Sequence, residues 1–411
     1  MTGTVARMSS APVHAPVRPV HDRPTLVSYA SLATWSWFVY AFGASLALLR
    51  DDQGTSAWLG GLHSTALAAG GIVGALLTPR LNHRFGRGPV ARAAAVGTSV
   101  CIVWYLWPGM PVGGTLAAIL VACFFGNIVV VVVNSFIATH QGAASAPAFT
   151  ESTGLAALMG LLAPLGVGLA AASVLGWRAG PLAAVVAFAL VEVWRGRNLS
   201  AYGGPGEVAT RKEAGPLPSR TWWALVAGMC YIGAEFCLSL WGVDLLRERA
   251  GLSPAAAAAG LSTVLGGLFI GRVFGVQIAE RVPVERLLRV SIVAGFIAFG
   301  VVWLATSPVV ILVAMFLTGV CLSLVWPLSM SRIIRAAAGQ ADRASALALA
   351  FTTTAIGLAP FVLGALAGSL GVHLAFLVVP ALLAVTFVLV VVRPVPEDSL
   401  GERAVDDGSA G

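Results

Sequence analysis

The feature that most constrains this chain is a succession of apolar runs, each long enough to cross a lipid bilayer. A transmembrane helix needs about 20 mostly apolar residues. Turn residues and charges divide the 411 residues into twelve such runs. The runs cover residues 25–49, 57–79, 90–108, 113–136, 149–173, 179–195, 221–246, 254–276, 285–306, 308–332, 343–369 and 372–392. The ten-residue alternation of membrane β-strands does not occur, so the sequence predicts an all-α membrane protein with twelve transmembrane helices.

The composition agrees with a membrane location. Hydrophobic residues make up 58% of the chain and charged residues only 10%, whereas soluble domains carry about 25% charged residues. So few charges cannot cover a water-soluble surface, and most of the outer surface is expected to face lipid. The net charge of +7 comes from basic residues that are scattered between the apolar runs. Because they form no patch, we expect no nucleic-acid partner.

The placement of lysine and arginine predicts the orientation of the chain. With the N-terminus inside, 21 of the 25 basic residues lie on the inner side, as the positive-inside rule requires. We therefore expect a multi-pass protein of the cell inner (plasma) membrane with both termini in the cytoplasm. Residues 1–24 would form an uncleaved cytoplasmic tail, because they lack the apolar core of a secretion signal. Residues 196–220 would form a cytoplasmic linker, and residues 393–411 a cytoplasmic C-terminal tail.

An internal repeat divides the apolar runs into two sets. Leu48-Leu49-Arg50-Asp51 recurs as Leu245-Leu246-Arg247-Glu248, 197 residues later, and Gly70-x-x-x-Gly74 recurs as Gly267-x-x-x-Gly271 at the same offset. The repeat predicts two homologous halves, residues 25–195 and 221–392, with six helices each. Because six is an even number, both halves would cross the membrane in the same direction, related by an axis along the membrane normal.

Twelve helices in two parallel halves resemble the major facilitator superfamily (MFS) of transporters, and loop motifs strengthen the resemblance. The loop His83-Arg84-Phe85-Gly86-Arg87 is similar to the family's inner-loop signature, with a histidine where the family has an acid. Ala279-Glu280-Arg281 is its echo in the second half. The resemblance implies an inner-loop gate made of His83, Arg84, Gly86, Arg87, Glu280 and Arg281. A solvated basic loop that follows the positive-inside rule is the competing interpretation.

The resemblance also implies that the first, fourth, seventh and tenth helices line a central cavity. Aromatic side chains there could stack on an apolar or aromatic substrate, and amide side chains could bind it through hydrogen bonds. The alternatives are aromatics that pack in the bundle or face lipid, and amides that bond a neighbouring helix. The candidates for substrate contact are Trp35, Tyr40, Asn127, Asn134, Tyr231, Trp241 and Trp326.

Glu235 is the most informative polar residue, because it lies in the middle of the seventh apolar run. A charged group at this depth costs about 2.5–3.5 kcal/mol, so it should face a cavity or a partner. Burial disfavours the charged form of a carboxyl group, so Glu235 could load and release a proton as its surroundings change. Contact with a substrate and a structural hydrogen bond are the alternative roles. Arg272 lies nearer the inner end of its run, and this difference in depth argues against an ion pair between the two.

These features predict a secondary active transporter that works by alternating access and is coupled to protons. The chain has no Walker nucleotide-binding loop, so we expect no direct use of ATP. The histidines are dispersed and no nucleophile–base pattern occurs, which argues against an enzyme. We expect neither a cofactor nor a metal. The expected partners are a small-molecule substrate, protons and membrane lipid, with the chain acting as a monomer.

Weaker signals bear on the direction of transport. The segment from Gly160 to Gly168, which contains Pro164, resembles a degraded Gly-Pro motif of drug/proton antiporters. Together with the aromatic residues, it favours proton-coupled efflux of a small hydrophobic or amphipathic molecule. The fourth run carries no arginine, although such antiporters often have one there. Proton-coupled import of a neutral solute such as a sugar is therefore the alternative.

Overall fold

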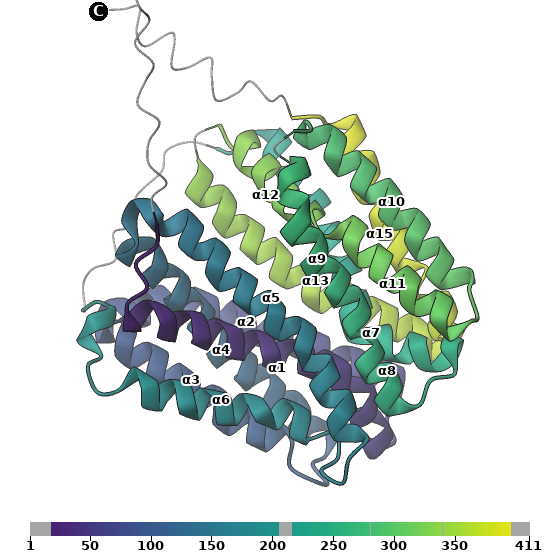
Figure 1. Cartoon of the computed structure of the whole chain (residues 1–411), viewed down its shortest axis with the longest axis horizontal. Helices are drawn as coiled ribbons and strands as arrows, with labels where there is room; N and C mark the ends of the chain where they lie inside the picture. The colour runs from purple at the N-terminus through teal and green to yellow at the C-terminus, as the bar shows by residue number, and fades with distance from the viewer. Residues whose placement is uncertain (1–17, 205–215, 280, 339, 396–411) are drawn as a thin grey trace, which may run out of the picture.

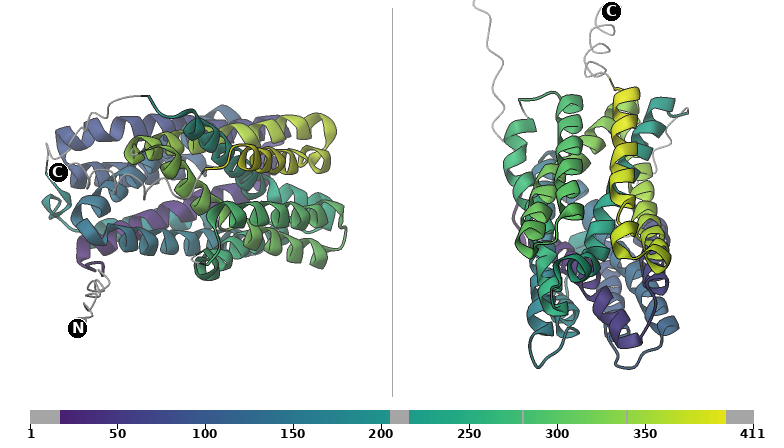
Figure 2. Two further views of the ribbon diagram at one scale, coloured as in Figure 1. Left: turned by 90° about the horizontal axis from the view of Figure 1, so that it is seen from above. Right: turned by 90° about the vertical axis from the view of Figure 1, so that its right-hand side faces the viewer.

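The computed structural model describes residues 18–204, 216–279, 281–338 and 340–395. Within these ranges the regular secondary structure is helical. The helices form two groups that lie next to each other, coloured purple to teal and green to yellow in Figure 1. We call them the N-terminal group, α1 to α6, and the C-terminal group, α7 to α15. In Figure 2 the long helices of both groups follow roughly one common direction.

The N-terminal group consists of six long helices. α1 packs against α5 and α6, while α4 packs against α2 and α3. The helices are α1 Arg23–Gln53, α2 Ala57–Phe85, α3 Arg87–Tyr105, α4 Val112–His140, α5 Ser145–Ala171 and α6 Ala179–Arg195, with the short 3-10 turns η1 Gly142–Ala144 and η2 Ser200–Tyr202.

The C-terminal group is organised around α7. This helix packs against α12, α13 and α15, while α11 packs against α9 and α10. The helices are α7 Ser219–Ala250, α8 Pro254–Gly260, α9 Ser262–Ala279, α10 Val284–Leu304, α11 Pro308–Leu322, α12 Val325–Ala336, α13 Ala341–Leu370, α14 Val372–Ala375 and α15 Val378–Val392.

Each predicted apolar run falls on helices, but three runs contain a break that the sequence analysis did not anticipate. The run 254–276 is divided between α8 and α9, the run 308–332 between α11 and α12, and the run 372–392 between α14 and α15. Pro327 favours the second break, because proline has no backbone N–H to donate to the carbonyl group four residues earlier.

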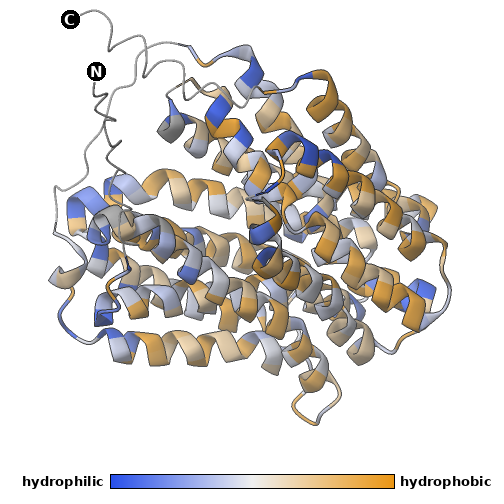
Figure 3. Cartoon of the chain, turned by 45° about the horizontal axis from the view of Figure 1, so that its top comes forward, coloured by the Kyte–Doolittle hydropathy of each residue, from blue (hydrophilic) through white to orange (hydrophobic). Residues whose placement is uncertain are grey.

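Ten helical stretches in the described residues are long and apolar enough to cross a membrane, judged by length and composition. Helices α3 and α6, on which two of the expected spans fall, are not among these ten. α6 has only 17 residues, and α3 carries Arg87 and Arg92 in its first two turns. The chain thus has an all-helical, multi-pass membrane fold, and Figure 3 shows apolar residues prevailing along the helices.

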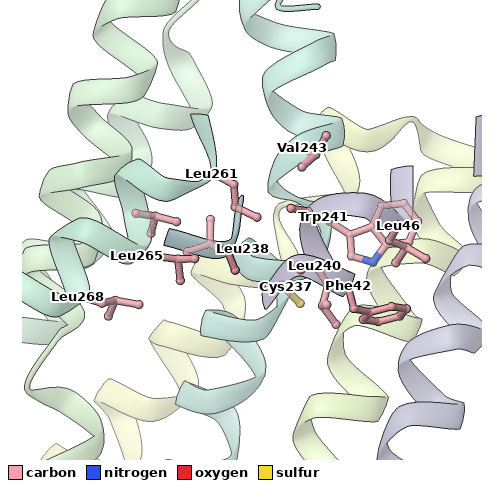
Figure 4. Packing of buried hydrophobic residues seen from close by; sticks show 14 of the residues in the cluster. Phe42, Leu46, Cys237, Leu238, Leu240, Trp241, Val243, Leu261, Leu265 and Leu268 are labelled. Carbon is pink, nitrogen blue, oxygen red and sulfur yellow. The ribbon is translucent and has the colours of Figure 1, made fainter. Parts of the chain in front are cut away.

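The two groups meet at one end of the molecule, which we call the closed end. It contains the C-terminal parts of α1, α5, α7 and α13 and the N-terminal parts of α2 and α8. There α2 packs against α13, α5 against α8 and α1 against α7. Gly43 of α1 lies against the backbone of Ser239 on α7, where a Cβ atom would come within 2.6 Å of the carbonyl oxygen. Large buried side chains fill this end (Figure 4), among them Phe42, Leu46 and Trp241.

Candidate functional site

Glu235 lies inside the C-terminal group, on α7, with its side chain only 6% exposed. The hydroxyl group of Tyr231, one helical turn earlier, donates a hydrogen bond to Glu235 Oε2 over 2.7 Å. The same hydroxyl lies 2.8 Å from the backbone carbonyl oxygen of Leu322, the last residue of α11. The carboxyl, the hydroxyl and the carbonyl therefore form a short hydrogen-bonded chain that joins α7 to α11.

The hydrogen-bond pattern of these three groups depends on whether Glu235 is ionised or protonated. An ionised carboxylate and a carbonyl oxygen both only accept hydrogen bonds, and the Tyr231 hydroxyl has a single hydrogen to donate. With Glu235 ionised, that hydrogen can satisfy one of the two acceptors at a time. With Glu235 protonated, the carboxyl group can donate to Tyr231, and Tyr231 can donate to Leu322. The geometry thus accommodates both states, with a different hydrogen-bond pattern in each.

The break between α11 and α12 places backbone carbonyl groups beside this carboxyl. α11 ends at Leu322 and α12 begins at Val325. Pro327 cannot donate a backbone hydrogen bond to the carbonyl of Ser323, four residues earlier. Arg272 Nε of α9 donates to that carbonyl over 3.4 Å. Irregular backbone at membrane depth is tolerated where it is buried in protein or lines a cavity, and broken helices commonly form binding sites there.

Arg272 also faces Glu235, so the expectation drawn from depth along the helices is wrong. Arg272 Nη2 lies 4.0 Å from Glu235 Oε1. The error has two physical causes. α9 continues to Ala279, beyond the predicted end of its run. In addition, side chains on a helix tilt towards its N-terminus, which carries the guanidinium group of Arg272 towards the depth of Glu235.

Tyr40 brings the N-terminal group to the same place. It lies on α1, is partly buried, and interacts electrostatically with Glu235 and Arg272. Its ring packs over Gly160 of α5, where a Cβ atom would come within 2.7 Å of the ring. Gly160, part of the antiporter-like segment, therefore permits close packing of α5 on α1. We call Glu235, Tyr231, Arg272 and Tyr40 the central polar cluster.

Three further cavity candidates lie partly buried within the bundle. Trp326 packs near Gly228 of α7. Asn127 donates a hydrogen bond from Nδ2 to the carbonyl of Cys123 on its own helix, over 3.1 Å. Asn134 lies two turns further along α4.

Two of the aromatic residues predicted to line the cavity are buried and pack against neighbouring helices. Trp35 is 7% exposed and packs against Gly126 of α4. Trp241 is fully buried, and its ring nitrogen donates a hydrogen bond to the carbonyl of Pro360 on α13 over 3.0 Å. Both side chains belong to the hydrophobic core that Figure 4 shows in part.

Among the described residues, two ion pairs join the groups at the closed end, and the sequence analysis missed them. Arg50 Nη2 lies 3.0 Å from Asp244 Oδ1, and Arg247 Nη1 lies 2.7 Å from Asp51 Oδ2. Arg50 and Arg247 occupy equivalent positions of the repeat, and each pairs with an acid of the opposite group. The guanidinium of Arg50 also lies 4.8 Å from the centre of the Trp241 ring. The repeat signalled that the two arginines correspond, but it carried no signal of their partners.

The predicted inner-loop residues lie where α2 meets α3 and near the end of α9. His83 and Arg84 are exposed, and Arg84 lies over the ring of Phe85 at 5.1 Å. Gly86 has a positive φ of 80° between the two helices, and Arg87 is buried and donates a hydrogen bond to Thr139 over 2.9 Å. Arg281 is exposed, and Glu280 lies outside the described residues.

The part of the chain that the structure describes contains no group of three or more His, Cys, Asp or Glu side chains that could hold a metal ion. The central polar cluster offers a carboxyl group, two phenolic hydroxyls, a guanidinium group and backbone carbonyls. These groups can bind a proton and polar or charged parts of a small molecule.

Comparisons with known proteins agree with the fold described above. A family model described as Major Facilitator Superfamily matches residues 224–408, whereas no curated protein matches the chain. Among solved structures, the nucleoside transporter NupG is similar with a TM-score of 0.70 and 14% identity, over 90% of this chain and 99% of that one. A D-xylose-proton symporter gives a TM-score of 0.71 and 14% identity, over 91% and 98%. The peptide transporter POT in complex with sulfate gives 0.72 and 13%, over 92% and 96%. The predicted resemblance to the MFS is confirmed, and the chain has the fold of these transporters.

Proposed function

We propose that this chain, which resembles the MFS in sequence over its C-terminal group and in fold, is a proton-coupled secondary transporter of a small molecule. Glu235 is the group that loads and releases the proton. The observation that carries the proposal is the hydrogen-bonded series from Glu235 through Tyr231 to the carbonyl of Leu322. This series offers hydrogen bonds to both protonation states of one buried carboxyl group. The similarity in fold to a D-xylose-proton symporter also supports proton coupling.

The proposed mechanism is alternating access by two six-helix halves, residues 25–195 and 221–392. In this proposal α3 and α6 also cross the membrane, which brings the ten spans found by length and composition to twelve. The placement of basic residues supports cytoplasmic termini in an inner (plasma) membrane. In this orientation the closed end faces away from the cytoplasm. The packing of α2 on α13 and of α5 on α8 at that end supports a state in which the central polar cluster is sealed from the outside.

We propose import as the direction, in place of the efflux that the sequence slightly favoured. A proton on Glu235 removes the negative charge that faces Arg272, so the cluster can hold a proton and a substrate together. Joint binding of both ligands is the requirement for symport, and an inward proton gradient then drives uptake. Efflux drew support from an aromatic cavity, and the burial of Trp35 and Trp241 in core packing weakens that support.

The coupling role of Glu235 is tested in proteoliposomes that contain a pH-sensitive dye. Sugars, nucleosides, amino acids and organic acids are added outside, and solute-dependent proton entry identifies a transported compound. We expect Glu235→Gln to abolish proton entry while the protein still exchanges labelled solute across the membrane. Glu248→Gln, which changes an exposed acid on the same helix, should leave proton entry intact. Full solute-driven proton entry by Glu235→Gln would refute the coupling role.

A further inference from the structure

We propose that the transported molecule carries an anionic group, such as a carboxylate, and that Arg272 binds this group. The inference rests on the proposed function, because it names the substrate class of the same site. It departs from the neutral or hydrophobic substrates that the sequence suggested. Its starting point is the set of contacts around the guanidinium group of Arg272.

The guanidinium group of Arg272 has little of its hydrogen-bonding capacity used. It carries five N–H donors, and in the described part of the chain one of them, on Nε, donates to Ser323 over 3.4 Å. Its distance to Glu235 is 4.0 Å, which is too long for a hydrogen bond. A cation at membrane depth is costly unless it is well paired. The weak pairing therefore favours a further anion at this position.

Arg272 lies on a helix at the junction of the two groups, because α9 packs against α5 of the N-terminal group. Its side chain is 37% exposed, whereas that of Glu235 is 6% exposed. Arg272 lies on α9 and interacts electrostatically with Tyr40 on α1, in the opposite group. Its guanidinium group thus lies near Glu235 of α7 and near the carbonyl of Ser323, in the break between α11 and α12. The side chain of Arg272 is therefore more accessible to an entering molecule than that of Glu235.

Charge balance decides which substrates fit. The titratable and charged groups around Glu235 are Tyr231 on its own helix, Arg272 on α9 and Tyr40 on α1. With Glu235 ionised, the charges of Glu235 and Arg272 offset each other. With Glu235 protonated, the cluster carries one positive charge, which an anion neutralises and a cation opposes. Guanidinium groups bind carboxylates strongly through paired N–H donors, so a proton and an anion bind together.

The test compares acids with their uncharged amides on the purified full-length protein. The probes are acetate, lactate and benzoate against acetamide, lactamide and benzamide, with binding measured by calorimetry and thermal stabilisation at pH values of about 5.5 and 7.5. We expect at least one carboxylate to bind about tenfold more tightly than its amide at the lower pH. Glu235→Gln, which mimics the protonated residue, should bind that carboxylate equally at both pH values. Arg272→Gln should lose the preference for the acid, and Arg286→Gln, at an exposed arginine of α10, should keep it.

Several results would overturn the inference. One is equal binding of every carboxylate and its amide, or the absence of any carboxylate-dependent stabilisation at the lower pH. Another is an unchanged acid preference in Arg272→Gln. If Arg272→Gln does not fold, the acid–amide comparison on wild-type protein and on Glu235→Gln decides. Failure of the proposed function looks different, because proton entry would then survive in Glu235→Gln whatever the probes bind.

Discussion

At the scale of single residues, one oxygen atom connects the buried carboxyl group to the backbone of the next helix. The hydroxyl of Tyr231 contacts both Glu235 and Leu322, and the residue is fully buried. Removal of that hydroxyl takes a hydrogen bond from the ionised carboxylate and from the protonated acid. Bonds to a charged group contribute about 1.5–3 kcal/mol and neutral ones about 0.5–1.5 kcal/mol. The ionised form therefore loses more.

We predict that Tyr231→Phe slows proton-coupled uptake and changes its dependence on pH, because the ionised and protonated forms of Glu235 lose hydrogen bonds of different strength. The measurement is the initial rate of uptake in proteoliposomes across a series of pH values. Tyr105→Phe removes another buried phenolic hydroxyl, on α3 of the N-terminal group, and should leave the profile in place. An unchanged profile in Tyr231→Phe would remove the hydroxyl from the mechanism.

The same residues show how far sequence reasoning reaches. Glu235 could be identified because an acid inside an apolar run is costly wherever the helix packs. Tyr231 was chosen only as an aromatic candidate for substrate contact, and its hydrogen bond to Glu235 was not predicted. The proximity of Arg272 to Glu235 could not be predicted from their depths along two helices. α9 ends later than predicted, and the long side chain of Arg272 tilts towards the start of α9, so both effects bring the guanidinium group closer to the depth of Glu235. Such a contact depends on three-dimensional packing that a single sequence does not encode locally.

At the scale of the helix, the break between α11 and α12 leaves backbone carbonyl oxygen atoms available to accept hydrogen bonds from side chains. Pro327 prevents one helical hydrogen bond, and Arg272 takes the carbonyl of Ser323 that becomes available. The sequence analysis named Trp326 for its aromatic ring and predicted an unbroken run over residues 308–332. The carbonyl groups were overlooked, because residue letters show side chains and not which backbone atoms lose their helical partners.

We predict that Pro327→Ala closes this break. The new N–H can donate to Ser323, and alanine is about 3 kcal/mol more favourable than proline inside a helix. The expected result is an equal or higher thermal stability together with a loss of transport of at least about tenfold, because Arg272 loses its carbonyl partner. Thermal unfolding and uptake are measured on the same preparation. Pro308→Ala serves as control, since proline at the start of α11 displaces no helical hydrogen bond. Normal transport by a stabilised Pro327→Ala protein would contradict the role of the break.

At the scale of the whole molecule, the two groups are joined at the closed end by ion pairs related through the repeat. The repeat predicted that Arg50 and Arg247 are equivalent, and the structure adds that each reaches across to the other group. A repeat shows which positions correspond, but it does not show which surfaces meet. The interface between the halves was therefore beyond the sequence, although both arginines were recognised in it.

The two pairs differ in strength, because they differ in burial. The side chains of Arg50 and Asp244 are 13% and 7% exposed, while those of Arg247 and Asp51 are 31% and 46% exposed. Breaking a buried pair leaves an uncompensated charge and costs about 3–5 kcal/mol, whereas an exposed pair contributes about 0–1 kcal/mol. Asp244 Oδ2 and Arg50 Nη1 have no hydrogen-bond partner in the described residues. The interactions of the buried pair thus do not fully offset the free-energy cost of removing its charges from water. Such a contact can hold the closed end and still open in each transport cycle.

We predict that Asp244→Asn opens the closed end and that Arg247→Gln hardly does. The measurement is the rate at which a water-soluble thiol reagent labels Ser239→Cys in a background with the five native cysteines replaced by alanine. Ser239 is buried, and its backbone lies against Gly43 of the opposite group. Asp244→Asn should raise the labelling rate by at least about tenfold, and Arg247→Gln by no more than about fivefold. The exchange Arg50→Asp with Asp244→Arg restores the pair in reverse and should return labelling towards the starting rate. A larger effect from Arg247→Gln than from Asp244→Asn would mean that burial does not set the strength of this gate.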